Sequence, residues 1–224
     1  MKHYMDYEKK YKEQLNENIK KVIEEIDSDY MNIKISKFAE KYDESPESIK
    51  KKIIEDEIFR KIFAKEPSKQ NFYQNVAAEY IKNIDGVEDF EVLPQGGDKA
   101  MYMVSGNLIQ GKSLKNKNQN SKSIDFYWRY YKYEVYASHK FIKEEGGAQD
   151  NQYQDVQNFL NDSRDNNLKD TYIIAICDGN YFKSKDNKTG DETKLKRLER
   201  LTNHKNTFVI DIERLGSILK KIKD

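Results

Sequence analysis

The segment 123–160, SIDFYWRYYKYEVYASHKFIKEEGGAQDNQYQDVQNFL, constrains the fold of this 224-residue chain more than any other stretch. Apolar and polar side chains alternate along residues 124–129 and again along residues 134–140, and a period of two is typical of strands that are buried on one face. The glycine pair Gly146-Gly147 then opens a predicted helix that runs to Leu160. The sequence therefore predicts two neighbouring strands followed by a helix.

The two strands are expected to pair as a hairpin around Tyr131 and Lys132. A loop of two or four residues places Asp125 directly opposite Ser138 and diagonal to Lys140, on one face of the sheet. A register shift of one residue would separate the acid from the lysine, because neighbouring side chains of a strand point to opposite faces. The hairpin thus predicts that a carboxylate and an amine converge.

Acidic residues in and before the following helix supply further carboxylates. Asp150 lies in its first turns and Asp155 further on, while Glu144 and Glu145 precede it. The glycine pair lets the main chain approach closely, so the carboxylate of Asp150 could come near Asp125. The structural alternatives are that Asp150 only stabilises the helix dipole and that the strand residues are only solvated.

Composition limits the class of protein. Charged residues make up 35% of the chain and hydrophobic residues 37%, and no apolar stretch has the length of a membrane span. The start, MKHYMDYEKKYKEQ, is not a signal peptide, and the single cysteine, Cys177, cannot form an internal disulfide. We therefore expect a cytoplasmic protein. Its net charge of +1 gives no overall attraction to nucleic acid, so DNA binding must use a local basic surface.

Residues 1–66 are expected to form a small helical domain. Apolar residues at helical spacing predict helices over 4–26, around 35–39 and over 46–58, the last with Ser45 as N-cap and Pro46 at its first position.

The turn between the last two of these helices has the spacing of a helix-turn-helix, a DNA-reading module. A recognition helix beginning at Pro46 would offer Ser48 to base edges, and Lys50 and Lys51 to phosphates. Two short helices joined by a polar turn are equally typical of a simple packing unit. Both interpretations remain open from the sequence.

Residues 67–224 are expected to form a second domain. A helix over 68–84, with Ser68 as its cap, precedes the sheet and carries Glu79 near its end. A glutamate on a helix surface is usually only solvated.

An acid that is an alternative to Asp125 lies between the first strands of this domain. A strand over 90–93 starts the predicted sheet, a strand over 100–104 continues it, and Ser105-Gly106-Asn107 makes a hairpin toward Leu108-Ile109. Asp98 lies between these two strands and is an alternative to Asp125 as the first acid of the candidate site. We prefer Asp125, because its strand leads directly into the strand that carries Lys140.

Residues 111–122, GKSLKNKNQNSK, are polar and basic without periodicity, which predicts a mobile loop. Its candidate phosphate contacts are Lys112, Lys115 and Lys117. Beyond residue 160, the pattern predicts a buried strand over 171–177, a basic helix containing Leu195, Leu198 and Leu201, a strand over 208–210 and a closing helix over 212–222.

An acid on one strand, a lysine on the next and this order of elements together resemble the PD-(D/E)xK nucleases. In that family, acids hold Mg²⁺ against the scissile phosphate, while the lysine positions or activates the attacking water. This chain departs from the pattern with Ser138 in Ser138-His139-Lys140, and some restriction endonucleases with Ser-x-Lys take the missing carboxylate from the following helix. The resemblance implies that Asp125 and Asp150 bind the metal and that Ser138 and Lys140 complete the site. In that family the helix before the sheet often adds an acid to the metal site, which makes Glu79 a further candidate.

The C-terminal part is also similar to FokI-like cleavage domains. The similarity rests on Gly96-Gly97-Asp98 before an apolar strand and on the stretches IIAICDGNYF and KLKRLERLTNHKNTFVIDIERL, and it covers roughly residues 68–224. It implies an α/β (α+β) fold: a restriction-endonuclease-like core with a central mixed sheet flanked by helices, beside the small N-terminal helical domain.

These resemblances imply a type II restriction endonuclease that uses Mg²⁺ to cut double-stranded DNA at a specific sequence. They also imply a homodimer or a partner subunit, because one site cuts one strand at a time, and a cognate DNA methyltransferase in the same system. Two other functions remain open. One is a non-catalytic DNA-binding or partner subunit, which Ser138 in place of an acid favours; the other is a structure-specific nuclease of repair or defence.

Overall fold

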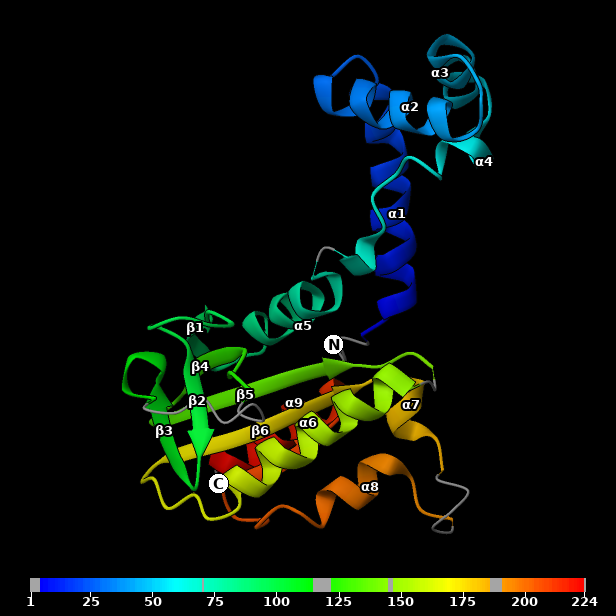
Figure 1. Ribbon diagram of the computed structural model, residues 1–224. Helices are drawn as coiled ribbons and strands as arrows, with labels where there is room; N and C mark the ends of the chain where they lie inside the picture. Colours follow the sequence, from blue (N-terminus) through cyan, green and yellow to red (C-terminus); the bar gives the residue numbers. More distant parts are fainter. Residues whose placement is uncertain (1–4, 70, 115–121, 145–146, 186–190, 224) are drawn as a thin grey trace. The chain divides into compact units, whose positions relative to one another are not determined.

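The computed structural model describes residues 5–69, 71–114, 122–144, 147–185 and 191–223 (Figure 1). The chain divides into two compact units, one of Asp6–Val76 and one of Met1–Met5 with Ala77–Asp224. The sequence-based domain boundary at 66/67 lies ten residues before the junction at Val76. Within the described part of the chain, none of the helices has the length and apolar character needed to cross a membrane.

The N-terminal unit is helical. Its helices are α1 (Tyr7–Glu24), α2 (Asp29–Lys41), α3 (Pro46–Glu55) and α4 (Glu57–Arg60), followed by the 3-10 helix η1 (Pro67–Lys69). Each of the four α-helices has an N-cap whose side chain accepts a main-chain hydrogen bond; these caps are Asp6, Ser28, Ser45 and Asp56. Buried Ile35, Ile49 and Ile53 belong to the core that holds the helices together. The predicted cap at Ser45 is thus confirmed.

The second unit alternates strands and helices after α5 (Phe72–Lys82), within which the junction lies. Its elements are β1 (Val87–Val92), β2 (Met101–Val104), β3 (Asn107–Gln110), the 3-10 helix η2 (Gly111–Ser113), β4 (Phe126–Tyr130), β5 (Tyr133–Phe141), α6 (Gly147–Ser163), β6 (Thr171–Asp178), α7 (Asn180–Lys183), α8 (Lys194–Glu199), β7 (Thr207–Ile210) and α9 (Ile212–Lys223). Five strands form the central sheet in the order β1-β4-β5-β6-β7. The fold is mixed α/β, with a mixed central sheet flanked by helices.

The predicted hairpin is confirmed as β4 and β5. The two strands pair antiparallel, with Phe126 opposite Ala137 and Tyr130 opposite Tyr133, so only Tyr131 and Lys132 form the loop. Tyr131 has a φ of 54°, the left-handed conformation that a loop of two residues requires here. Neither glycine nor asparagine marks this turn, and the register therefore comes from the paired strands.

The sheet becomes parallel after the hairpin, and helices cover its two faces. β5 pairs parallel with β6, and β6 with β7. In Figure 1, α6 crosses one face of the sheet and α9 lies behind the other. The α6 face contains a buried cluster that includes Val156, Phe159 and Leu160 of the helix with Ala175 and Cys177 of β6. Burial of these apolar surfaces is the main stabilising contribution to the unit.

Three sequence predictions about local structure are wrong. β2 and β3 form a separate two-stranded sheet instead of continuing the central one; their tip docks on the end of α6, where Gly106 N donates to Asp162 O at 2.7 Å. Ser68 is not a helix cap, because it lies within η1, and α5 begins four residues later. The helix expected over 46–58 is interrupted at Asp56, whose carboxylate caps α4.

Candidate functional site

Asp125 lies at the start of the hairpin, buried to 8% exposure. Its Oδ2 accepts a hydrogen bond from the main-chain N–H of His139 at 2.7 Å and another from Ser138 Oγ at 3.2 Å. The observed register continues to this level, so Asp125 stands opposite Ser138. The geometry that the sequence predicted for this acid and serine is present.

Lys140 follows two residues after Ser138, on the same side of β5. In the parallel pairing, Ser138 is level with Ala175 and Lys140 with Cys177, and both β6 residues belong to the cluster beneath α6. Because partners in neighbouring strands point to the same face, Lys140 and Ser138 share the α6 face with Asp125. The fold therefore gathers an acid, a hydroxyl and an amine at one end of β5.

The electrostatic state of Asp125 reflects two opposing effects. Burial raises the pKa of Asp125, while the hydrogen bond from His139 N and the charge of Lys140 lower it. A buried carboxylate is costly unless it is paired with positive charge and hydrogen-bond donors. A cation bound beside Asp125 would offset this cost.

The two acids of α6 face different neighbours. Asp150 is exposed, and its Oδ1 accepts a hydrogen bond from Tyr181 Oη at 2.8 Å. Asp155 forms an ion pair with Lys122 at 3.1 Å, three residues before Asp125 in the chain. Five residues along an α-helix correspond to a rotation of about 140°, so the two carboxylates leave the helix in different directions. Of the two, Asp155 contacts the segment that leads into Asp125, and Asp150 contacts α7.

The other acids proposed for the site lie at the surface. Glu79 is exposed on α5, and Asp98 is exposed in the segment between β1 and β2. Tyr80, the neighbour of Glu79, lies near Asp178, whose charge contributes to raising the pKa of Tyr80 after the larger effects of burial and Glu213. Asp178 lies on the α9 side of the sheet.

A second buried acid was missed by the sequence reasoning. Asp178 ends β6 with 4% exposure, and its Oδ2 lies 3.2 Å from His139 Nε2. Its Oδ1 accepts from the main-chain N–H of Ile212, the first residue of α9. The His139 ring therefore lies on the opposite face of the sheet from Asp125, because neighbouring side chains of a strand alternate between the two faces. The available signal for Asp178 was a polar residue before Gly179 at the end of an apolar strand.

The residues proposed to read DNA in the N-terminal unit are bonded to acids. Lys50 forms an ion pair with Asp27, and Ser48 Oγ donates to Glu44 Oε2 at 2.9 Å. Lys51 lies 3.9 Å from Glu55, one helical turn further on. In the second unit Lys112 is exposed in η2, whereas Lys115 and Lys117 lie outside the described residues.

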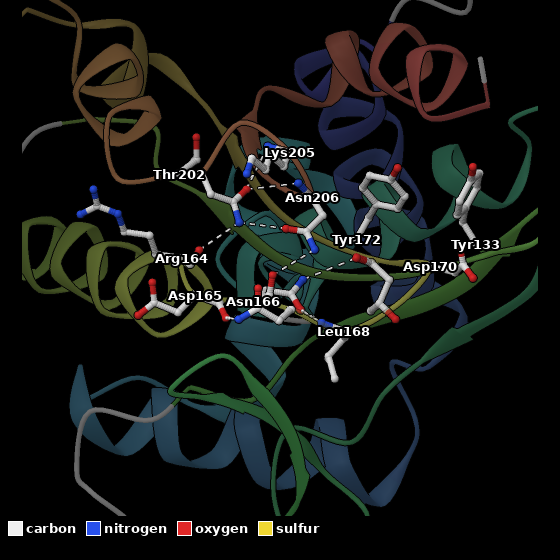
Figure 2. Close-up of a pocket in the computed structure, with 13 residues that line it drawn as sticks. Tyr133, Arg164, Asp165, Asn166, Leu168, Asp170, Tyr172, Thr202, Lys205 and Asn206 are labelled. Atoms are coloured by element: carbon white, nitrogen blue, oxygen red, sulfur yellow. Dashed lines mark hydrogen bonds between the residues drawn. The ribbon is translucent and has the colours of Figure 1, made fainter.

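A hollow of about 940 Å³ lies at the opposite end of the strands from Asp125 (Figure 2). Residues at the start of β5 and β6 line it together with the loops that precede β6 and β7. Its asparagines hold these loops: Asn203 Oδ1 accepts from three main-chain N–H groups, and Asn206 Nδ2 donates to Asn166 O. The polar lining thus has a structural explanation.

The described residues contain no cluster of three or more His, Cys, Asp or Glu side chains arranged to hold a metal ion. Mg²⁺ is commonly bound by only one or two carboxylates together with water and substrate phosphate. Asp125 and one acid of α6 would supply such a set.

Comparison of the chain with protein-family models, curated proteins and solved structures gives no match.

Proposed function

We propose that this protein is a Mg²⁺-dependent endonuclease of the PD-(D/E)xK type that hydrolyses phosphodiester bonds in double-stranded DNA, as a type II restriction endonuclease. The observation that carries the proposal is the buried carboxylate of Asp125, bonded to Ser138 and to the His139 main chain, on the strand pair that also carries Lys140. The mixed central sheet flanked by helices is compatible with a core of this type.

Each residue has a distinct role in this proposal. Asp125 binds the metal through a carboxylate oxygen, and Ser138 keeps that carboxylate in place through its hydrogen bond. Lys140 orients the attacking water with its ammonium group. The bound Mg²⁺ would stabilise negative charge on the scissile phosphate and on the leaving oxygen.

The acid that replaces the one absent at position 138 comes from α6. Asp150 is the candidate from the sequence, and its hydrogen bond to Tyr181 leaves it on the α7 side. Asp155 is supported by its ion pair with Lys122, because this carboxylate is already held by a cation near the strand of Asp125. In the metal-bound protein, Mg²⁺ would replace the ammonium group of Lys122 as the partner of the Asp155 carboxylate.

Cleavage of DNA by the purified full-length chain tests the function. Wild-type protein with Mg²⁺ and DNA of mixed sequence is expected to yield discrete fragments. Asp125→Ala and Lys140→Ala should abolish them, whereas the matched changes Asp98→Ala and Lys143→Ala, at an exposed acid and an exposed lysine, should not. Unchanged cleavage by Asp125→Ala and Lys140→Ala would refute the assignment of the site.

The two α6 acids are separated by a second comparison. Asp155→Asn and Asp150→Asn are assayed for cleavage over a range of Mg²⁺ concentrations. The variant that lacks the metal ligand should need far more Mg²⁺ or lose activity, because removal of a carboxylate ligand weakens metal binding. Loss in the Asp150 variant alone would assign the role to Asp150, and loss in the Asp155 variant alone to Asp155.

A non-catalytic DNA-binding or partner subunit is the second candidate, favoured by Ser138 at the place of a metal-binding acid. It predicts DNA binding without cleavage in either Mg²⁺ or Mn²⁺. A structure-specific nuclease would instead cut flaps or ends in preference to a fixed sequence. For the restriction enzyme, cutting both strands would require a second copy or a partner subunit, and a cognate methyltransferase would protect the host DNA.

A further inference from the structure

His139 connects two buried carboxylates on opposite faces of the sheet. Its main-chain N–H donates to Asp125 Oδ2 at 2.7 Å, and its ring Nε2 lies 3.2 Å from Asp178 Oδ2. The three residues are buried, with 8% exposure or less. One residue therefore contacts the candidate metal ligand through its main chain and a second acid through its ring.

Asp178 is itself held by several main-chain contacts. Its Oδ1 accepts from Ile212 N at 2.9 Å, at the first residue of α9, where the helix dipole favours negative charge. Its carbonyl oxygen accepts from Ile142 N at 2.9 Å, just beyond the end of β5. The carboxylate of Asp178 is thus bonded to the start of α9, and its main chain is bonded to the residue that follows β5, so Asp178 provides a firm support for the imidazole ring.

We propose that His139 is a positioning residue for Asp125, acting through its pairing with Asp178. This inference rests on the proposed role of Asp125 as a metal ligand. A ligand carboxylate must be held at a defined rotation, and groups that hydrogen-bond to metal ligands commonly determine metal affinity. The His139 N–H provides such a bond, and the ring anchors the peptide unit that bears it.

A side-chain change at His139 separates this role from the hydrogen bond itself. Every substitution except proline keeps the main-chain N–H, so any loss of metal binding reports a displaced peptide unit and not a missing donor. Gln and Asn form a matched pair, because both carry an amide. The longer Gln can reach toward Asp178 as the imidazole does, and the shorter Asn cannot.

The test measures Mn²⁺ binding to full-length protein without DNA, by electron paramagnetic resonance, and then the Mg²⁺ concentration that gives half-maximal DNA cleavage. His139→Ala and His139→Asn are expected to raise the Mn²⁺ dissociation constant and the half-maximal Mg²⁺ concentration about tenfold. His139→Gln is expected to keep both values within about threefold of wild type. Ile176→Val is the packing control, since Ile176 is the buried register partner of His139 on β6. It should leave both values unchanged.

The outcomes distinguish this inference from the function on which it depends. Wild-type protein that neither binds Mn²⁺ nor cleaves DNA would refute both. Wild-type binding that persists unchanged in folded His139→Ala and His139→Asn protein would refute the positioning role alone, as would an equal loss in Ile176→Val. If the alanine variant does not fold, the Asn and Gln pair decides, and equal affinities in that pair would overturn the proposal.

Discussion

At the scale of single residues, the candidate site buries the carboxyl group of Asp125, and this burial reduces the stability of the folded protein. Asp125 is almost inaccessible to solvent, and it accepts hydrogen bonds from Ser138 and from the main chain of His139. Functional sites commonly retain groups of this kind although they reduce stability.

Replacement of Asp125 by Asn should stabilise the protein at neutral pH. Burial raises the pKa of Asp125, so the folded state binds this proton more tightly than the unfolded chain does. The stability that the protonated Asp125 carboxyl contributes is fully present below the ordinary carboxyl pKa of about 3.9. It is lost as the pH rises through the higher pKa that Asp125 has in the folded state.

We expect Asp125→Asn to raise the free energy of unfolding by about 1 kcal/mol at pH 7, with a gain that shrinks toward pH 4. Urea unfolding at both pH values measures this difference. Asp98→Asn, at an exposed acid, serves as the control and should change stability little. A less stable Asp125→Asn protein at pH 7 would contradict the electrostatic explanation.

Gly179 should not tolerate a side chain. Its φ is 99°, and a Cβ atom would lie 2.1 Å from the carbonyl oxygen of Ile142. Gly179→Ala is expected to cost about 2 kcal/mol or more in unfolding free energy. Gly216→Ala is the matched change inside α9, where the new Cβ meets no atom within 4 Å, and it should gain about 0.5–1 kcal/mol. Equal effects of the two substitutions in urea unfolding would contradict this account.

At the scale of elements, capping and strand pairing explain where the segments begin and end. Ser45 Oγ accepts from Ser48 N at 3.1 Å at the start of α3, and Asp56 ends that helix by capping α4. A polar side chain can thus either begin a helix or interrupt one that apolar spacing alone would continue. The unexpected break at Asp56 shows the second effect.

Ser45→Ala should destabilise the N-terminal unit by about 1 kcal/mol, because the main-chain N–H of Ser48 loses its acceptor. Ser45→Asp should keep the cap and remain close to wild type. The helical circular dichroism signal, followed through urea unfolding, measures both variants. If Ala and Asp had the same effect, the cap would not be the cause of any loss.

At the scale of the whole molecule, charge gives little help to DNA binding. The net charge is +1, and the lysines of α3 proposed to contact DNA are already paired with acids. Binding would therefore require these lysines to exchange carboxylates for phosphates, and it should weaken steeply with salt. Metal binding is the more direct whole-molecule test, because it needs no DNA.

Mg²⁺ should stabilise the folded protein through the Asp125 site. A ligand that binds only the folded state adds about 2.7 kcal/mol at a hundredfold excess over its dissociation constant. We expect thermal unfolding of the wild-type protein to shift upward with Mg²⁺, as should that of Asp98→Asn. Asp125→Asn should lose the shift, and an equal shift in that variant would place the bound ion elsewhere.

The sequence by itself determined those features that depend on neighbouring residues. Alternation along 124–140 predicted the hairpin, and the loop length predicted that Asp125 lies opposite Ser138. The Ser45 cap was predictable for the same reason, since capping acts within one helical turn. Periodicity and capping are local properties, and local patterns survive in whatever tertiary structure forms.

Only the tertiary structure decided which distant groups meet. The bond between His139 and Asp178, the separate β2–β3 sheet and the different neighbours of Asp150 and Asp155 depend on how segments dozens of residues apart pack together. No spacing in the sequence encodes the rotation of α6 over the sheet. That rotation follows from burial of the apolar side of the helix, and it determines the direction in which each acid points.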